Sequence, residues 1–133
     1  ITRAELDACA EAQGTEVRAG DILLVRTGWL DLFDQGTKDY RQPGLGVDSL
    51  SFVDDHEIAA IGVDNSAVEV IPFDGDDALV LHIELLVKRG VTLMEHVKLS
   101  ELAADRCYEF FLSVGALPVP GAAGSPINPV AIG

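Results

Sequence analysis

Short runs of branched apolar residues are spaced along the chain and separated by polar stretches of varied length. Continuous apolar runs at 22–26, 58–63 and 91–94 are typical of strands that are buried on both faces. A further run at 108–114 predicts a fourth strand, and 130–132 predicts a short one that closes the chain. These runs together predict a largely buried sheet, in which 22–26 and 58–63 are expected to be central strands.

The first helix is predicted from its ends as well as from its spacing. Thr2 and Glu5 form a T-x-x-E capping box, which predicts a helix over 3–13 that ends at Gly14. Residues 29–33 form an apolar patch whose pattern favours neither a helix nor a strand. The chain therefore begins with a helix and reaches its first strand through a turn.

A second helix is predicted over 79–89, where apolar residues recur with helical spacing up to a glycine stop at Gly90. A short helix is predicted from Ser51 and another over 100–105, while 72–77 reads as an acidic turn. Each of these three helices lies between two predicted strands.

This alternation of strands and helices predicts an α/β fold with a mixed sheet and flanking helices. Residues 116–119 are expected to pair near the last strands. A length of 133 residues suits a single domain over 1–133, with enough chain to bury a core.

The composition narrows the classes of partner. A formal net charge of −13 excludes nucleic acid and anionic membranes as expected partners, because both repel an acidic surface. No apolar run reaches the roughly 18 residues that a membrane span needs. Cys9 and Cys107 fit no metal-ligand or redox spacing, so a reducing cytoplasm is the expected location.

His82 and Glu95 are the residues with the clearest chemistry. The helix, glycine and strand between them are expected to fold back so that both side chains face one cavity. A neutral imidazole and a carboxylate are both good ligands for a divalent metal. Two ligands do not complete a catalytic zinc site, which normally has three protein ligands and an open position. The alternative for His82 is a partly buried core histidine that is hydrogen-bonded to a backbone carbonyl.

Three further residues follow buried strands, where α/β proteins commonly bind ligands. Asp64 and Asn65 come directly after the run at 58–63 and are candidates for substrate binding, with an Asx-type turn as the alternative. Arg26 closes the run at 22–26 and is a candidate for binding an anionic substrate, with a structural ion pair as the alternative.

Seven segments, taken in order, resemble the putative cyclase family of bacterial kynurenine formamidase and isatin hydrolase. They are GDILLVRTGW (20–29), PGLGVDSLSFVDDHEIAAIGVDN (43–65), AVEVIP (67–72), HIELLVKRGVTLMEH (82–96), LSELAAD (99–105), YEFF (108–111) and GSPINPVAI (124–132).

The resemblance implies a swivelling β/β/α-like fold and metal-dependent hydrolysis of an amide or lactam, with zinc or manganese. It places His82 and Glu95 at metal-ligand positions, and Asp64 and Asn65 in the segment that lines the family's site. No catalytic residue is assigned, because the family's catalytic base lies upstream.

The departure from the family is large. An upstream motif of the form HxGTHxDxPxH supplies most of the family's metal ligands, and no such motif occurs here. The resemblance therefore implies the C-terminal portion of a hydrolase, whose two ligands alone would hold a cation weakly or not at all. The alternatives are a truncated, non-catalytic relative that oligomerises and binds a small molecule, or an unrelated α/β domain. A homo-oligomer, dimeric or larger, is expected in either of the first two cases.

Overall fold

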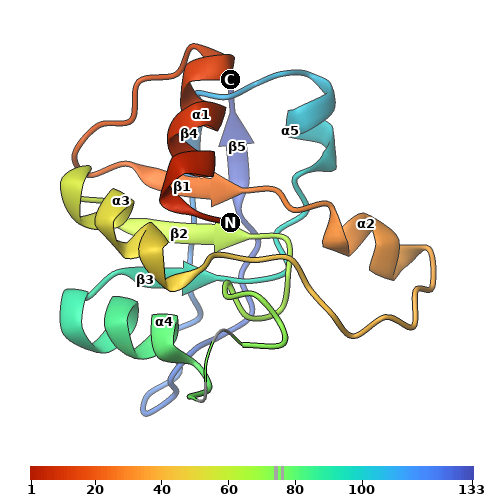
Figure 1. Ribbon diagram of the computed structural model, residues 1–133. Helices are drawn as coiled ribbons and strands as arrows, with labels where there is room; N and C mark the ends of the chain where they lie inside the picture. The colour runs from red at the N-terminus through yellow and green to blue at the C-terminus, as the bar shows by residue number, and fades with distance from the viewer. Residues whose placement is uncertain (74, 76) are drawn as a thin grey trace.

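The centre of the molecule is a parallel sheet of three strands, seen in a computed structural model that describes residues 1–73, 75 and 77–133 (Figure 1). The strand order is β1 (Ile22–Val25), β2 (Ala60–Val63) and β3 (Thr92–Met94). Ile61 pairs in register with a leucine on each side. Because the strands are parallel, their carboxyl ends lie along one edge, where α/β folds usually place ligands.

One face of this sheet packs against helices. The helices are α1 (Arg3–Gln13) and α3 (Leu50–Asp55), which lie beside each other and contribute Leu6 and Phe52 to the core. Ile61 at the centre of β2 is fully buried in the same cluster. All four residues of β2 are buried, because the strand lies between β1 and β3 and is covered by these helices.

The predicted helix before β3 forms as two continuous parts, α4 (Val80–His82) and the wider-wound η2 (Ile83–Arg89). Leu81 and Leu85 fix this helix to the core. Gly90, with a φ of 70°, ends it in the left-handed conformation that glycine adopts without a steric cost. The chain then turns directly into β3.

The remaining elements surround the sheet. They are α2 (Trp29–Asp34), the 3₁₀ turn η1 (Val47–Ser49), α5 (Ser100–Ala104), and the antiparallel pair β4 (Phe111–Ser113) and β5 (Val130–Ile132). In Figure 1, α2 projects away from the sheet, and the β4–β5 ribbon runs nearly perpendicular to the parallel strands.

The α/β class and the flanking helices are confirmed, and helix 3–13 has the predicted bounds. The mixed sheet divides into a parallel and an antiparallel sheet. The run at 22–26 was expected in a central position, but β1 lies at the edge of its sheet and pairs only with β2. The apolar patch at 29–33 belongs to α2.

The C-terminal strands were predicted too long. Only 111–113 of the run at 108–114 pairs as a strand, and 116–119 forms none. The predicted turn at 72–77 includes residues 74 and 76, which lie outside the described residues.

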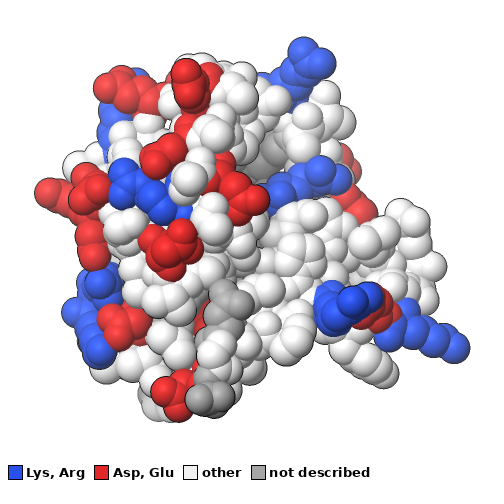
Figure 2. Space-filling view, in the orientation of Figure 1, with Lys and Arg blue, Asp and Glu red and all other residues white. Residues whose placement is uncertain are grey.

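Within the described part of the chain, no helix is both long and apolar enough to cross a membrane. Acidic and basic side chains intermingle over the face of the molecule that Figure 2 shows, both on the side of α1 and α3 and around α2.

Candidate functional site

His82 and Glu95 meet at the carboxyl edge of the parallel sheet. The His82 Nε2 atom lies 3.3 Å from Glu95 Oε1, and both side chains are partly exposed. The helix that carries His82 runs back antiparallel to β3, so its first turn lies at the edge where β3 ends. Glu95 follows Met94, the last residue of β3, and therefore faces that turn. The expected approach of these two side chains, thirteen positions apart, is confirmed.

Glu69 is a third member of this cluster that the sequence analysis missed. Its Oε1 atom accepts hydrogen bonds from the His82 backbone N–H and from the ring nitrogen Nδ1, each at 3.0 Å. The residue is only 5% exposed. The sequence gives one indication of its role: Glu69 is an acidic residue inside the otherwise apolar segment 67–71. His82 is thus contacted by a buried carboxylate on one ring nitrogen and by Glu95 on the other.

A tight turn positions Glu69. The Asn65 side chain accepts a hydrogen bond from the Val68 N–H at 2.8 Å and donates one to the Glu69 carbonyl at 3.0 Å. Val68 has a φ of 61°, a conformation that a β-branched residue rarely adopts and that tends to occur near functional sites. Gly44 passes so close that an added Cβ would lie 2.3 Å from the Glu69 backbone.

The His82–Glu95 pair fits a divalent metal in chemistry and spacing. Two ligands at about 2.0–2.1 Å from one tetrahedral ion lie roughly 3.3–3.4 Å apart, close to the observed 3.3 Å. Glu69 cannot join them, because it occupies the opposite ring nitrogen. No group of three or more metal-ligating side chains suitable for a metal occurs among the residues that the structure describes. The metal role of His82 and Glu95 stays a prediction.

Asp64 joins the ends of two strands. Its carboxylate accepts hydrogen bonds from the Thr27 N–H, the Thr27 hydroxyl and the Gly28 N–H at 2.6–2.7 Å. It is 2% exposed, and Asn65 is fully buried with both side-chain polar atoms hydrogen-bonded to backbone. In this structure both residues therefore organise loops, and their contact with substrate stays a prediction.

Arg26 forms an ion pair with Asp31 of α2, with its guanidinium 2.6 Å from the carboxylate. This is the structural alternative weighed from the sequence, and the pairing leaves Arg26 partly exposed at the end of β1. Its binding of an anionic substrate stays a prediction.

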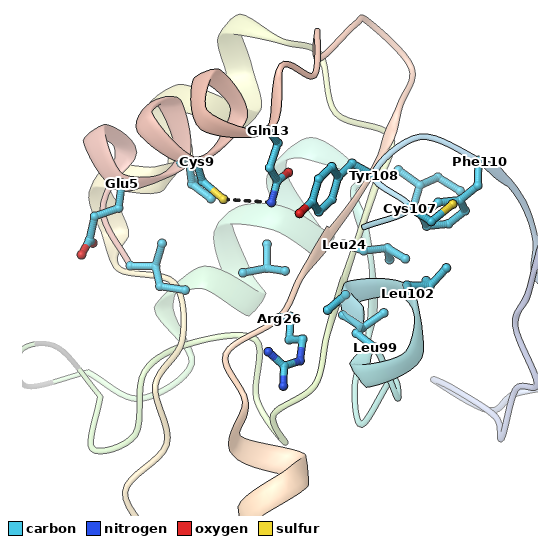
Figure 3. Close-up of a pocket in the computed structure, with 15 residues that line it drawn as sticks. Glu5, Cys9, Gln13, Leu24, Arg26, Leu99, Leu102, Cys107, Tyr108 and Phe110 are labelled. Atoms are coloured by element: carbon cyan, nitrogen blue, oxygen red, sulfur yellow. Dashed lines mark hydrogen bonds between the residues drawn. The ribbon is translucent and has the colours of Figure 1, made fainter. Parts of the chain in front are cut away.

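Arg26 also lines a cavity of about 370 Å³ beside β1. Figure 3 shows Cys9 and Gln13 entering this cavity from α1, with Leu99 and Leu102 on the α5 side and Tyr108 beyond. The walls are mainly apolar side chains, and neither His82 nor Glu95 is among them. The cavity is thus separate from the histidine–carboxylate cluster.

These features define an α/β domain with a histidine–carboxylate cluster at the carboxyl edge of its parallel sheet. The family model described as "Putative cyclase" matches residues 1–70, which is more than half of the 133 residues. The chain therefore belongs to the putative cyclase family. His82 and Glu95 lie beyond the part that this model matches.

The whole chain has a counterpart in a solved structure described as the crystal structure of a novel cyclase. The two share 33% sequence identity with a TM-score of 0.88. The match covers 100% of this chain and 47% of that chain, so this chain spans about half the length of the solved cyclase. No curated protein matched the chain.

Proposed function

We propose that this chain is the C-terminal portion of a metal-dependent hydrolase that cleaves an amide or lactam. In this proposal His82 and Glu95 are two of the ligands of a zinc or manganese ion. The approach of His82 Nε2 and Glu95 Oε1 to 3.3 Å, from separate elements and on a partly exposed face, is the observation that supports it. Membership of the cyclase family supports the class of reaction.

The chemistry divides between this chain and other parts of the enzyme. When bound, a divalent cation would polarise the scissile carbonyl and acidify water. His82 and Glu95 would hold that cation, and Asp64 would keep the neighbouring strand ends in place. No residue here is assigned as the general base, so the base and the remaining ligands are expected from a segment corresponding to the rest of the solved cyclase.

Titration of the purified chain with Zn²⁺ or Mn²⁺ in a calorimeter tests the ligand assignment. We expect weak binding at most, which is lost in His82→Ala and reduced in Glu95→Gln, because two ligands do not complete a site. His56→Ala is the matched control, since His56 bonds a backbone carbonyl of its own helix. Equal affinities in wild type and His82→Ala would contradict the assignment.

Hydrolysis is tested by fusing the corresponding N-terminal segment of the solved cyclase upstream of Ile1. We expect the fusion to hydrolyse N-formylkynurenine or an isatin-like lactam only with metal present, and the isolated chain to do neither. Turnover by the isolated chain, or turnover by the fusion that survives His82→Ala, would exclude the proposed division of the site.

A second candidate function is non-catalytic binding of a small molecule, favoured by the cavity beside β1. Its volume of about 370 Å³ lies within the range of ligand pockets, roughly 300–1,000 Å³. Ligand binding distinguishes the two candidates. A binder that uses this cavity would need neither metal nor His82, so its ligand affinity would be unchanged by removal of metal and by substitution of His82.

A further inference from the structure

We propose that Glu69 is a positioning residue for His82: its buried carboxylate holds the imidazole in the tautomer that protonates Nδ1 and presents the bare Nε2 atom toward Glu95. The tautomer can be tested without any metal. The consequence for metal affinity rests on the function proposed above for His82.

The hydrogen-bond chemistry determines the tautomer. Carboxylates face both ring nitrogens of His82, and an ionised carboxylate only accepts hydrogen bonds. Glu69 is buried and forms a hydrogen bond with Nδ1 at 3.0 Å, whereas Glu95 is partly exposed and lies 3.3 Å from Nε2 without hydrogen-bond geometry. In the neutral ring the proton is therefore placed on Nδ1 and the lone pair on Nε2. Metal-bound histidines commonly donate their second ring N–H to a carboxylate in this way.

The same oxygen also fixes the backbone of His82. Glu69 Oε1 accepts the His82 N–H at 3.0 Å, and this N–H lies in the first turn of α4, where helical amides lack intrahelical partners. Leu79, the residue before the helix, makes no side-chain hydrogen bond that caps it. One carboxylate oxygen therefore holds both the ring and the start of the helix that carries it.

The burial of Glu69 has a cost in free energy. Burial of a carboxylate is unfavourable unless it gains partners, and no ion pair among the described residues joins Glu69 to a lysine or arginine. The Asn65 side chain forms hydrogen bonds with the Val68 N–H and the Glu69 carbonyl, and Val68 between them is left-handed. A group held in this way at such a cost, with His82 as its hydrogen-bonded partner, indicates a role directed at that histidine.

Nitrogen-15 spectra of the histidine rings at alkaline pH test the tautomer in the metal-free chain. The chain has three histidines, so single substitutions assign the His82 signals. We expect the Nδ1–H tautomer in wild type and in Glu69→Gln, whose amide oxygen can still accept. Glu69→Ala should shift His82 toward the Nε2–H form. Glu84→Ala is the control, because Glu84 lies on the same helix and pairs with Lys88 and Arg89.

The outcomes separate this inference from the proposed function. An Nε2–H tautomer in wild type, or an Nδ1–H tautomer that persists in Glu69→Ala, would overturn the role of Glu69 whatever the metal result. Zn²⁺ affinity should fall about 10- to 100-fold in Glu69→Ala and less in Glu69→Gln. An unchanged Zn²⁺ affinity in Glu69→Ala would also overturn the role. Turnover by the fusion that survives His82→Ala would refute the proposed function, and the wild-type tautomer would still decide the inference. That measurement is made on the wild-type chain, and histidine variants serve only to assign its signals.

Discussion

Gly44 is the residue on which the placement of Glu69 most directly depends. It is buried, and a Cβ at this position would lie 2.3 Å from both the carbonyl carbon and the carbonyl oxygen of Glu69. Backbone atoms cannot move aside as the end of a flexible side chain can. The segment before Leu45 can therefore approach the Glu69 turn only because this position has no side chain.

We expect Gly44→Ala to lower the free energy of unfolding by about 1–3 kcal/mol, the usual cost of forcing extra atoms into a packed site. Gly115→Ala is the matched control, since an added Cβ there meets no atom within 4 Å and its φ is not positive. Urea denaturation of both variants is the measurement. Equal free energies of unfolding for the two variants would show that the Glu69 turn can shift to make room for the added methyl group.

At this scale the sequence indicated the chemistry of individual residues better than their positions. His82 and Glu95 could be predicted as a pair because the helix, glycine stop and strand between them can be read from their order. Glu69 could not, because its approach depends on a left-handed Val68 and on the side-chain bonds of Asn65. Local sequence patterns predict neither the left-handed conformation of Val68 nor these hydrogen bonds.

At the scale of elements, Arg89 links the end of η2 to α3. Its guanidinium bonds both carboxylate oxygens of Asp54, at 2.6 and 2.9 Å, and also contacts Glu84. Arg89 lowers the pKa of Asp54 below its ordinary value of 3.8. Lys88 first, and Arg89 second, lower the pKa of Glu84 below 4.5. Both carboxylates are thus favoured in their charged form in the folded chain.

We therefore expect the link to stabilise the fold above the ordinary pKa values of the two carboxylates and to weaken as they gain protons. The difference in unfolding free energy between wild type and Arg89→Gln should be largest near neutral pH. It should shrink as the pH falls through 4.5 and 3.8 toward the lowered values. Chemical denaturation over a pH series is the measurement.

Arg18→Gln is the control for this pH series. Its partner, Glu16, lies two residues away, so the unfolded chain can form the same pair and little stability should depend on it. A difference for Arg89→Gln that stays constant across the series would mean that the link contributes by packing and not by charge.

The helices and strands were largely predictable from the sequence, whereas the order and pairing of the strands were not. Continuous apolar runs predicted all three parallel strands, because burial on both faces leaves a clear composition. Which strand lies at an edge is a property of the whole sheet, so the central position expected for 22–26 was wrong. The run at 108–114 was apolar enough to predict a long strand, yet only 111–113 finds a partner strand.

At the scale of the whole molecule, the β4–β5 ribbon presents apolar side chains to solvent. Phe111 is 66% exposed, Ile132 is 60% exposed, and all three residues of β5 are exposed. An isolated two-stranded ribbon is marginally stable in water, and open strand edges favour pairing with another chain. Contiguous exposed apolar surface commonly marks an interface. This ribbon is therefore the surface at which we expect a second copy of the chain to bind.

Light scattering across a concentration series should accordingly give a mass above 14.1 kDa, the mass of one chain. Phe111→Lys combined with Ile132→Lys should shift the mass toward the monomer, while Val87→Lys, an equally apolar but separate exposed site on η2, should not. The net charge of −13 opposes association, but charges are screened beyond roughly 8 Å at physiological salt. Raising the salt concentration should then favour the larger species, because apolar burial remains while repulsion weakens. A constant mass near 14.1 kDa up to high micromolar concentration would mean that the ribbon is stable when exposed.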